Sequence, residues 1–205
     1  MDAVELVASV TTPLNAVDIL EIPRAATWLQ IRADLIGDVP ADWLRENFPG
    51  KLLYSLRSCR AGGKFEGLGE ERHSRLIAAA RDYDLVELEA DSDLGPELLA
   101  AIPATKRMVS CRSVACDVAQ FHSCFQQIAA VPARYYCVSA SAARTSDGLH
   151  PLLFLQALSA GTWSRFAKAP LVYGADCFCP ILERPFCLAS WTIRPARWAS
   201  CMFSN

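Results

Sequence analysis

The stretch "LQIRADL" (residues 29–35) alternates apolar and polar side chains along its whole length. Successive side chains of a strand point to opposite faces, so Leu29 and Ile31 share one face. Gln30, Arg32 and Asp34 share the other face. An open sheet between helices buries both faces, whereas a closed barrel has an interior where polar side chains can converge. The alternation therefore favours an α/β fold of the (β/α)₈ TIM-barrel type over an open doubly wound sheet.

Three later segments repeat the same split, with Ser55 and Arg57, Glu87 and Glu89, and Ser110 and Arg112 on their polar faces. Apolar segments typical of strands cover residues 4–12, 28–36, 52–58, 85–91, 106–113, 133–139 and 170–175. Patterns typical of helices lie between them, most clearly over residues 70–83 and 114–131. The chain has neither GxGxxG nor GxxxxGK[ST], so a nucleotide-binding open sheet is the weaker alternative.

The composition is that of a single globular unit. The chain has 205 residues, of which 52% are hydrophobic, and a net charge of -2, which gives no reason to expect a nucleic-acid partner. The N-terminal residues lack the basic region of a signal peptide, and no apolar run approaches the roughly 20 residues that span a bilayer. We therefore expect a cytoplasmic protein without a membrane partner.

The nine cysteines form no CxxC pair and have no histidine at ligand spacing. Zinc ligands require such clusters, so we expect no metal site. An odd number of cysteines without an export signal indicates reduced thiols.

The stretch "LLYSLRSCRAGGKFEG" (residues 52–67) ends a predicted strand at Arg57 and continues into Gly62 and Gly63. Barrels of this type carry their sites at the carboxyl ends of the strands, where Arg57 would lie. The predicted inward-facing charges are Arg32, Arg57 and Arg112 against Asp34, Glu87 and Glu89. They form either a site for a small carboxylate or hydroxylated anion, or a self-neutralising ion network, and the spacing alone does not separate the two.

Six segments in order resemble type I 3-dehydroquinate dehydratases over about residues 4–175: "LQIRADLIGD", "LLYSLRSCRAGGKFEG", "ERHSRLIAAARDYDLVELEAD", "PATKRMVSCRS", "ARYYCVSAS" and "GTWSRFAKAPLVYGA". The resemblance implies a (β/α)₈ barrel of the shikimate pathway of aromatic amino acid biosynthesis. It also implies a carbon–oxygen lyase that converts 3-dehydroquinate to 3-dehydroshikimate without metal or cofactor. In that family a lysine on the sixth strand forms a Schiff base with the substrate ketone, and a histidine ending the fifth strand transfers protons.

The binding positions of the family carry over in part. Arg32, Arg57 and Arg165 match its arginines, and the resemblance implies that they bind substrate. Gln30 stands where the family has a glutamate, so it keeps the hydrogen bonding without the charge. Ala61 stands where an acidic residue is expected before the Gly-Gly pair.

The two reactive positions do not carry over. Arg112 stands at the histidine position and Cys137 at the Schiff-base lysine position, and residues 131–158 contain no lysine. A cysteine does not supply the electron sink of a protonated imine, and arginine is a poor base. We therefore expect impaired or absent dehydratase activity.

Two other interpretations follow from the loss of the reactive residues. The alternative is a non-catalytic barrel that binds 3-dehydroquinate or a related shikimate-pathway acid, or that docks to a pathway enzyme; the chain could also form a homodimer. A third interpretation is the product of a degraded gene that folds poorly.

The end of the chain departs from the family. The helical stretch that ends before "AGTWSR" is followed so soon by residues 170–175 that no seventh strand fits between them. We therefore expect an incomplete barrel with residues 170–175 as its last strand. Residues 176–205 hold four of the nine cysteines and show no clear period. We therefore divide the chain into a dehydratase-like barrel, 1–175, and an atypical tail, 176–205, which we interpret as translation in another reading frame.

Overall fold

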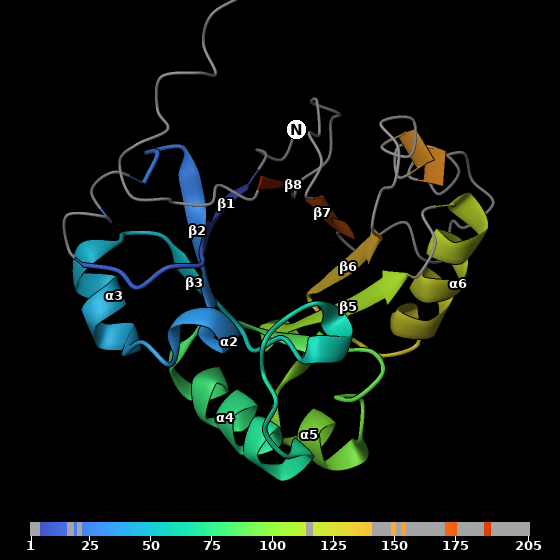
Figure 1. The fold of residues 1–205 in the computed structure, drawn as a ribbon, viewed down its shortest axis with the longest axis horizontal. Coiled ribbons are helices and arrows are strands. Elements are labelled where there is room, and N and C mark those ends of the chain that lie inside the picture. Colours follow the sequence, from blue (N-terminus) through green and yellow to red (C-terminus); the bar gives the residue numbers. More distant parts are fainter. Residues whose placement is uncertain are drawn as a thin grey trace, which may run out of the picture.

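Eight parallel strands form a closed ring in chain order in the computed structural model of the protein. The structure describes residues 5–15, 19, 22–113, 117–140, 149–150, 153–154, 171–175 and 187–189. The strands are β1 (Leu6–Val10), β2 (Ala26–Arg32), β3 (Lys51–Ser55), β4 (Leu85–Glu89), β5 (Arg107–Ser113), β6 (Tyr135–Ala140), β7 (Leu171–Ala175) and β8 (Cys187–Ala189). The predicted TIM-barrel fold is thereby confirmed (Figure 1).

The described helices lie around the outside of the strands (Figure 1). They are α2 (Ala33–Ile36), α3 (Ala41–Asn47), α4 (Gly69–Asp82), α5 (Pro96–Ala101) and α6 (Val118–Ala129), with short 3₁₀ turns η1 (Cys59–Ala61) and η2 (Ala104–Lys106). Helices α4 and α6 confirm the two helical predictions, and the side chain of Asp117 caps α6 by accepting from the Gln120 N–H at 2.8 Å. None of the described helices is long and apolar enough to cross a bilayer.

The two faces of each strand bury different partners. Leu29 and Ile31 of β2 are fully buried among residues of the surrounding helices. A separate apolar cluster consists of Val7, Trp28, Leu53, Leu85, Met108, Tyr135 and Cys137. Its members come from six neighbouring strands and from no helix, so this cluster fills the interior of the barrel. Gln30 and Arg32 follow Trp28 at steps of two, which places them on the same inward face.

Two strand predictions need correction. Strand β2 ends at Arg32, and residues 33–36 form helix α2 where a continued strand was expected. The backbone turns there so that Asp34 pairs with Arg32 through two hydrogen bonds of 2.9 and 2.8 Å. The segment expected to be the last strand of an incomplete barrel is β7, and it is followed by one more strand. It pairs with β6 on one side and with β8 on the other.

The closing part of the barrel is altered, as expected. Strand β8 has three residues, which lie in the stretch assigned to the tail. It pairs with β7 over three positions and with β1 only at Leu6↔Cys187. The ring is therefore held at this point by a much shorter ladder than between β5 and β6, which pair over six positions.

Candidate functional site

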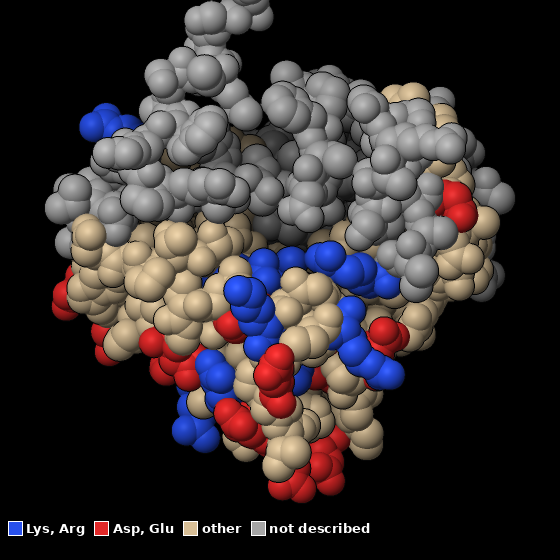
Figure 2. Space-filling model, viewed as in Figure 1, with Lys and Arg blue, Asp and Glu red and all other residues tan. Residues whose placement is uncertain are grey.

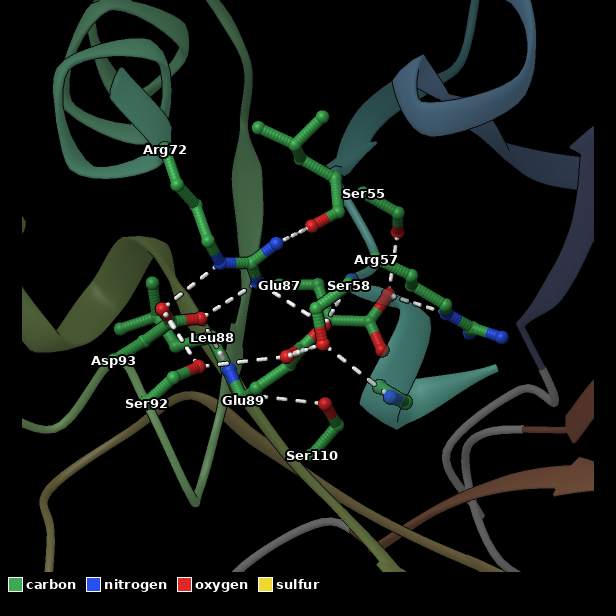
Figure 3. Close-up of polar contacts among 12 residues, drawn as sticks. Ser55, Arg57, Ser58, Arg72, Glu87, Leu88, Glu89, Ser92, Asp93 and Ser110 are labelled. Carbon is green, nitrogen blue, oxygen red and sulfur yellow. Dashed lines mark hydrogen bonds and ion pairs between the residues drawn. The ribbon is translucent and has the colours of Figure 1, made fainter. Parts of the chain in front are cut away.

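A chain of hydrogen bonds crosses the interior of the barrel from β2 to β4. The Gln30 side-chain amide donates to Ser55 Oγ at 2.7 Å, and Ser55 donates to Glu87 Oε2 at 2.6 Å. Arg57, two residues beyond β3, donates from Nε to the same carboxylate oxygen at 3.2 Å (Figure 3). The sequence-predicted residues Gln30, Arg57 and Glu87 are therefore brought together at the carboxyl ends of their strands.

Glu87 is ionised in spite of its burial. Its side chain is only 4% exposed, and burial alone would raise its pKa. The charge of Arg57 and the hydrogen bonds from Ser55 and Arg57 outweigh the burial and hold the pKa of Glu87 below its usual range. In return, the charge of Glu87 raises the pKa of Arg57, so both partners stay charged.

Among the residues that the structure describes, the terminal nitrogens of Arg57 donate to no partner. Only its Nε is engaged by Glu87, and Figure 3 shows its terminal nitrogens pointing away from the neighbouring charged cluster at Arg72. Arg32, in contrast, uses Nε and one terminal nitrogen in its fork with Asp34. Asp34 also accepts the backbone N–H of Lys64 at 3.1 Å, which ties the loop after β3 to β2.

Arg112 lies under the Gly-Gly pair of that loop. A Cβ added at Gly62 would be 3.0 Å from the Arg112 Nη1 and 3.4 Å from its Cζ, so any larger residue here would be tightly packed against the guanidinium. Gly62 also has φ +74°, a conformation that favours glycine. A Cβ at Gly63 would fall 2.1 Å from the Arg57 carbonyl oxygen. The two glycines thus let the loop pack closely against Arg57 and Arg112.

A second ionic cluster was missed from the sequence. Arg72, on α4, forms ion pairs with Asp93 at 2.8 Å and with Glu89 at 3.1 Å, and it donates to the Leu56 carbonyl. Ser58 donates from its N–H and hydroxyl to Glu89 at 2.8 and 2.6 Å. The sequence feature that could have revealed this cluster is the spacing of Arg72 and Leu76. Residues four apart share one face of a helix, and this face of α4 is buried.

Cys137 lies inside the barrel, 3% exposed, among the apolar residues of the interior cluster. It is close enough to Arg57 to contribute to the raised pKa of that arginine, after the larger contribution of Glu87. Within the described part of the chain, no group of three or more His, Cys, Asp or Glu side chains could hold a metal ion.

Two of the described lysines are engaged away from the site. Lys51 opens β3, pairs with Glu5 at 3.2 Å and lies 5.1 Å from the ring centre of Trp28, at the amino end of the barrel. Lys106 precedes β5 and donates to the Ala80 carbonyl at 2.7 Å. Arg165 and Lys168 lie outside the described residues.

Solved dehydratases share this arrangement of strands. The type I 3-dehydroquinate dehydratase of Clostridium difficile, solved with covalently modified comenic acid, matches with a TM-score of 0.66 at 12% identity, over 84% of this chain and 75% of that one. The chain has the fold of a type I 3-dehydroquinate dehydratase. The Geobacillus kaustophilus dehydratase matches with a TM-score of 0.64 at 19% identity, over 84% of this chain and 74% of that one.

A larger protein contains the same dehydratase fold. The dehydroquinate dehydratase and shikimate dehydrogenase of S. pombe matches with a TM-score of 0.60 at 17% identity, over 82% of this chain and 36% of that one. At these identities the likeness establishes the fold alone. No protein-family model matches the sequence, and no curated protein is similar enough in sequence to count as a relative.

Proposed function

We propose that the chain is a 3-dehydroquinate dehydratase-like protein whose barrel binds 3-dehydroquinate or a related hydroxylated carboxylate. The observation that carries the proposal is the state of Arg57, which is fixed by Glu87 through Nε and keeps its terminal nitrogens for a ligand carboxylate. It stands at the end of a barrel strand, in a fold whose similar structures are 3-dehydroquinate dehydratases. Gln30, Arg32 and Arg165 are the other proposed ligand-binding residues.

The proposed reaction is the loss of water from a β-hydroxyketone. A base removes the proton next to the ketone, an enolate forms, and the hydroxyl leaves with a proton as water. Arg112 can stabilise the negative oxygen of the enolate, but it does not accept a proton at neutral pH. The Cys137 thiol forms no imine with the ketone. We therefore infer an impaired or inactive carbon–oxygen lyase, because catalytic groups that act as a unit lose most of their effect together.

The S. pombe protein joins dehydroquinate dehydratase and shikimate dehydrogenase in one chain. This supports another shikimate-pathway enzyme as the class of protein partner. The division into a barrel, 1–175, and an atypical tail, 176–205, stays a prediction, as do the homodimer and the cytoplasmic location.

The test is turnover of 3-dehydroquinate by the purified protein, followed by the ultraviolet absorbance of the conjugated product. Arg57→Ala is the test variant and Arg75→Ala the matched control, because Arg75 is an arginine that pairs with the exposed Asp38 on the outside of the barrel. Thermal stabilisation by 3-dehydroquinate is measured on the same samples, so that binding is seen even without turnover.

We expect stabilisation of the wild type and of Arg75→Ala, its loss in Arg57→Ala, and little or no product. Rapid turnover that survives Arg57→Ala would contradict the assignment of Arg57. A folded wild type that 3-dehydroquinate does not stabilise would overturn the proposed function.

A further inference from the structure

We infer that Arg112 is a second anion-binding group, so that the site prefers a small hydroxylated ligand with two negative charges over one with a single carboxylate. The inference rests on the proposed function, because it takes Arg57 to hold the first anionic group. It departs from that function in the class of ligand.

Arg112 has no counter-charge among the described residues. The described carboxylates of the site are already engaged: Asp34 by Arg32, Glu87 by Arg57, and Glu89 and Asp93 by Arg72. No described carboxylate lies within 4.0 Å of the Arg112 guanidinium, which is partly exposed at the end of β5. A partly buried guanidinium without a partner is stabilised when an anion binds to it.

The part of the loop around Gly62 and Gly63 adds positive charge. Between Ser58 and Phe65 the only charged residues are Arg60 and Lys64. Figure 2 shows lysine and arginine side chains gathered in a band across the middle of the face in view. The residue before Gly62 is Ala61, and the loop's carboxylate, Glu66, lies 4.0 Å from the Cys59 sulfur.

The loop beside Arg112 is anchored at several points. The Gly63 N–H donates to the Ser58 carbonyl at 2.8 Å, and the Phe65 N–H donates to the Arg57 carbonyl at 3.1 Å. The Lys64 N–H adds its bond of 3.1 Å to Asp34. Arg112 lies beside the loop that starts at Arg57, since a Cβ added at Gly62 would be 3.0 Å from its guanidinium. One small ligand bound at the loop would then meet both arginines.

The negative side of the site faces elsewhere. Arg72, Glu89 and Asp93 together carry one excess negative charge, but their side chains are 7% exposed or less. Ser58 covers Glu89, and Figure 3 shows Arg57 extending away from this cluster. A ligand at Arg57 and Arg112 therefore meets two cations, of which only Arg57 has a carboxylate partner among the described residues.

The experiment compares three probes by titration calorimetry at one ionic strength and pH 7.5. Glycerate carries one charge, malate carries two on separate carboxylates, and glycerol 3-phosphate carries nearly two on one phosphate. We expect malate, glycerol 3-phosphate or both to bind about tenfold more tightly than glycerate, since a hydrogen bond to a charged group adds at least this factor. The tighter probe identifies the kind of anion.

Arg112→Gln tests the assignment, with Arg60→Gln as a matched control on the exposed part of the same loop. We expect Arg112→Gln to weaken the binding of the doubly charged probes more than that of glycerate, so that the tenfold preference is lost, and Arg60→Gln to keep the preference. Equal affinities for all three probes in the wild type would overturn the inference while leaving the proposed function standing. Failure of every probe and of 3-dehydroquinate to bind the folded wild type would overturn both.

Discussion

Glu87→Gln is the change that most directly tests how the site is held together. The substitution keeps the shape of the side chain but removes the carboxylate that accepts from Ser55 at 2.6 Å and from Arg57 at 3.2 Å. Arg57, 17% exposed, is then a mostly buried cation without a counter-charge. Breaking a buried pair from one side costs about 3–5 kcal/mol, and we take about 3 kcal/mol because the arginine reaches the mouth of the barrel.

The assay is urea unfolding of the wild type and the variant. A loss of about 3 kcal/mol lowers the folded-to-unfolded ratio by about two orders of magnitude and the melting temperature by about 6–12 °C for a chain of this size. The double variant Glu87→Gln with Arg57→Gln should be less destabilised than the sum of the single changes, because neither charge is left alone. A loss below about 1 kcal/mol in Glu87→Gln would refute the reasoning.

The same pair of proteins gives a pH test with a defined sign. The folded state lowers the pKa of Glu87 from its ordinary 4.5, so the carboxylate contributes stability above that pH. The contribution is lost as the pH falls through the lower, folded-state pKa, because the unfolded chain binds the proton first. The stability difference between wild type and Glu87→Gln should therefore be constant from neutral pH down to about 4.5 and shrink below it. A difference that grows on acidification would contradict the assignment.

Two further substitutions test the parts around the site by the same unfolding assay. Arg72→Met should lower the free energy of unfolding by about 3–5 kcal/mol, because two buried carboxylates lose their cation. Arg75→Met, on the same helix, should lower it by less than about 1 kcal/mol. Equal losses in the two variants would contradict the role of the buried cluster. Gly63→Ala should cost about 1–3 kcal/mol, since its Cβ would clash with the Arg57 backbone, while Gly69→Ala, with nothing within 4 Å, should be neutral. An unchanged stability of Gly63→Ala would mean that the loop relaxes freely.

The barrel could be predicted because its strands have two unlike faces. Residues such as Leu29 and Gln30 alternate in sequence because one packs under helices and the other faces the interior. The boundary of β2 could not be predicted, because the turn after Arg32 is stabilised by an ion pair with Asp34 that the alternating pattern continues through.

The site was predicted in part for the same reason. Arg57 and Glu87 follow from the strand pattern, since both lie on the inward face near strand ends. The Arg72 cluster depends on a helix packing across two strands, and no local period reports which buried position of that helix will be charged. The position of β7 in the ring depends on its pairing with β6, which is a long-range contact.

The neutral amide of Gln30 restricts which single mutations the interior of this barrel tolerates. Its Nε2 lies 3.5 Å from Glu87 Oε2, so Gln30→Glu would set a second buried carboxylate against the first, and two such groups do not both ionise at neutral pH. Cys137→Lys would instead add a cation near Arg57. Each change is unfavourable alone, but the two together leave the net charge of the barrel interior unchanged. Libraries that vary one position at a time would discard both, and a search for amine chemistry in this barrel has to sample positions 30 and 137 jointly.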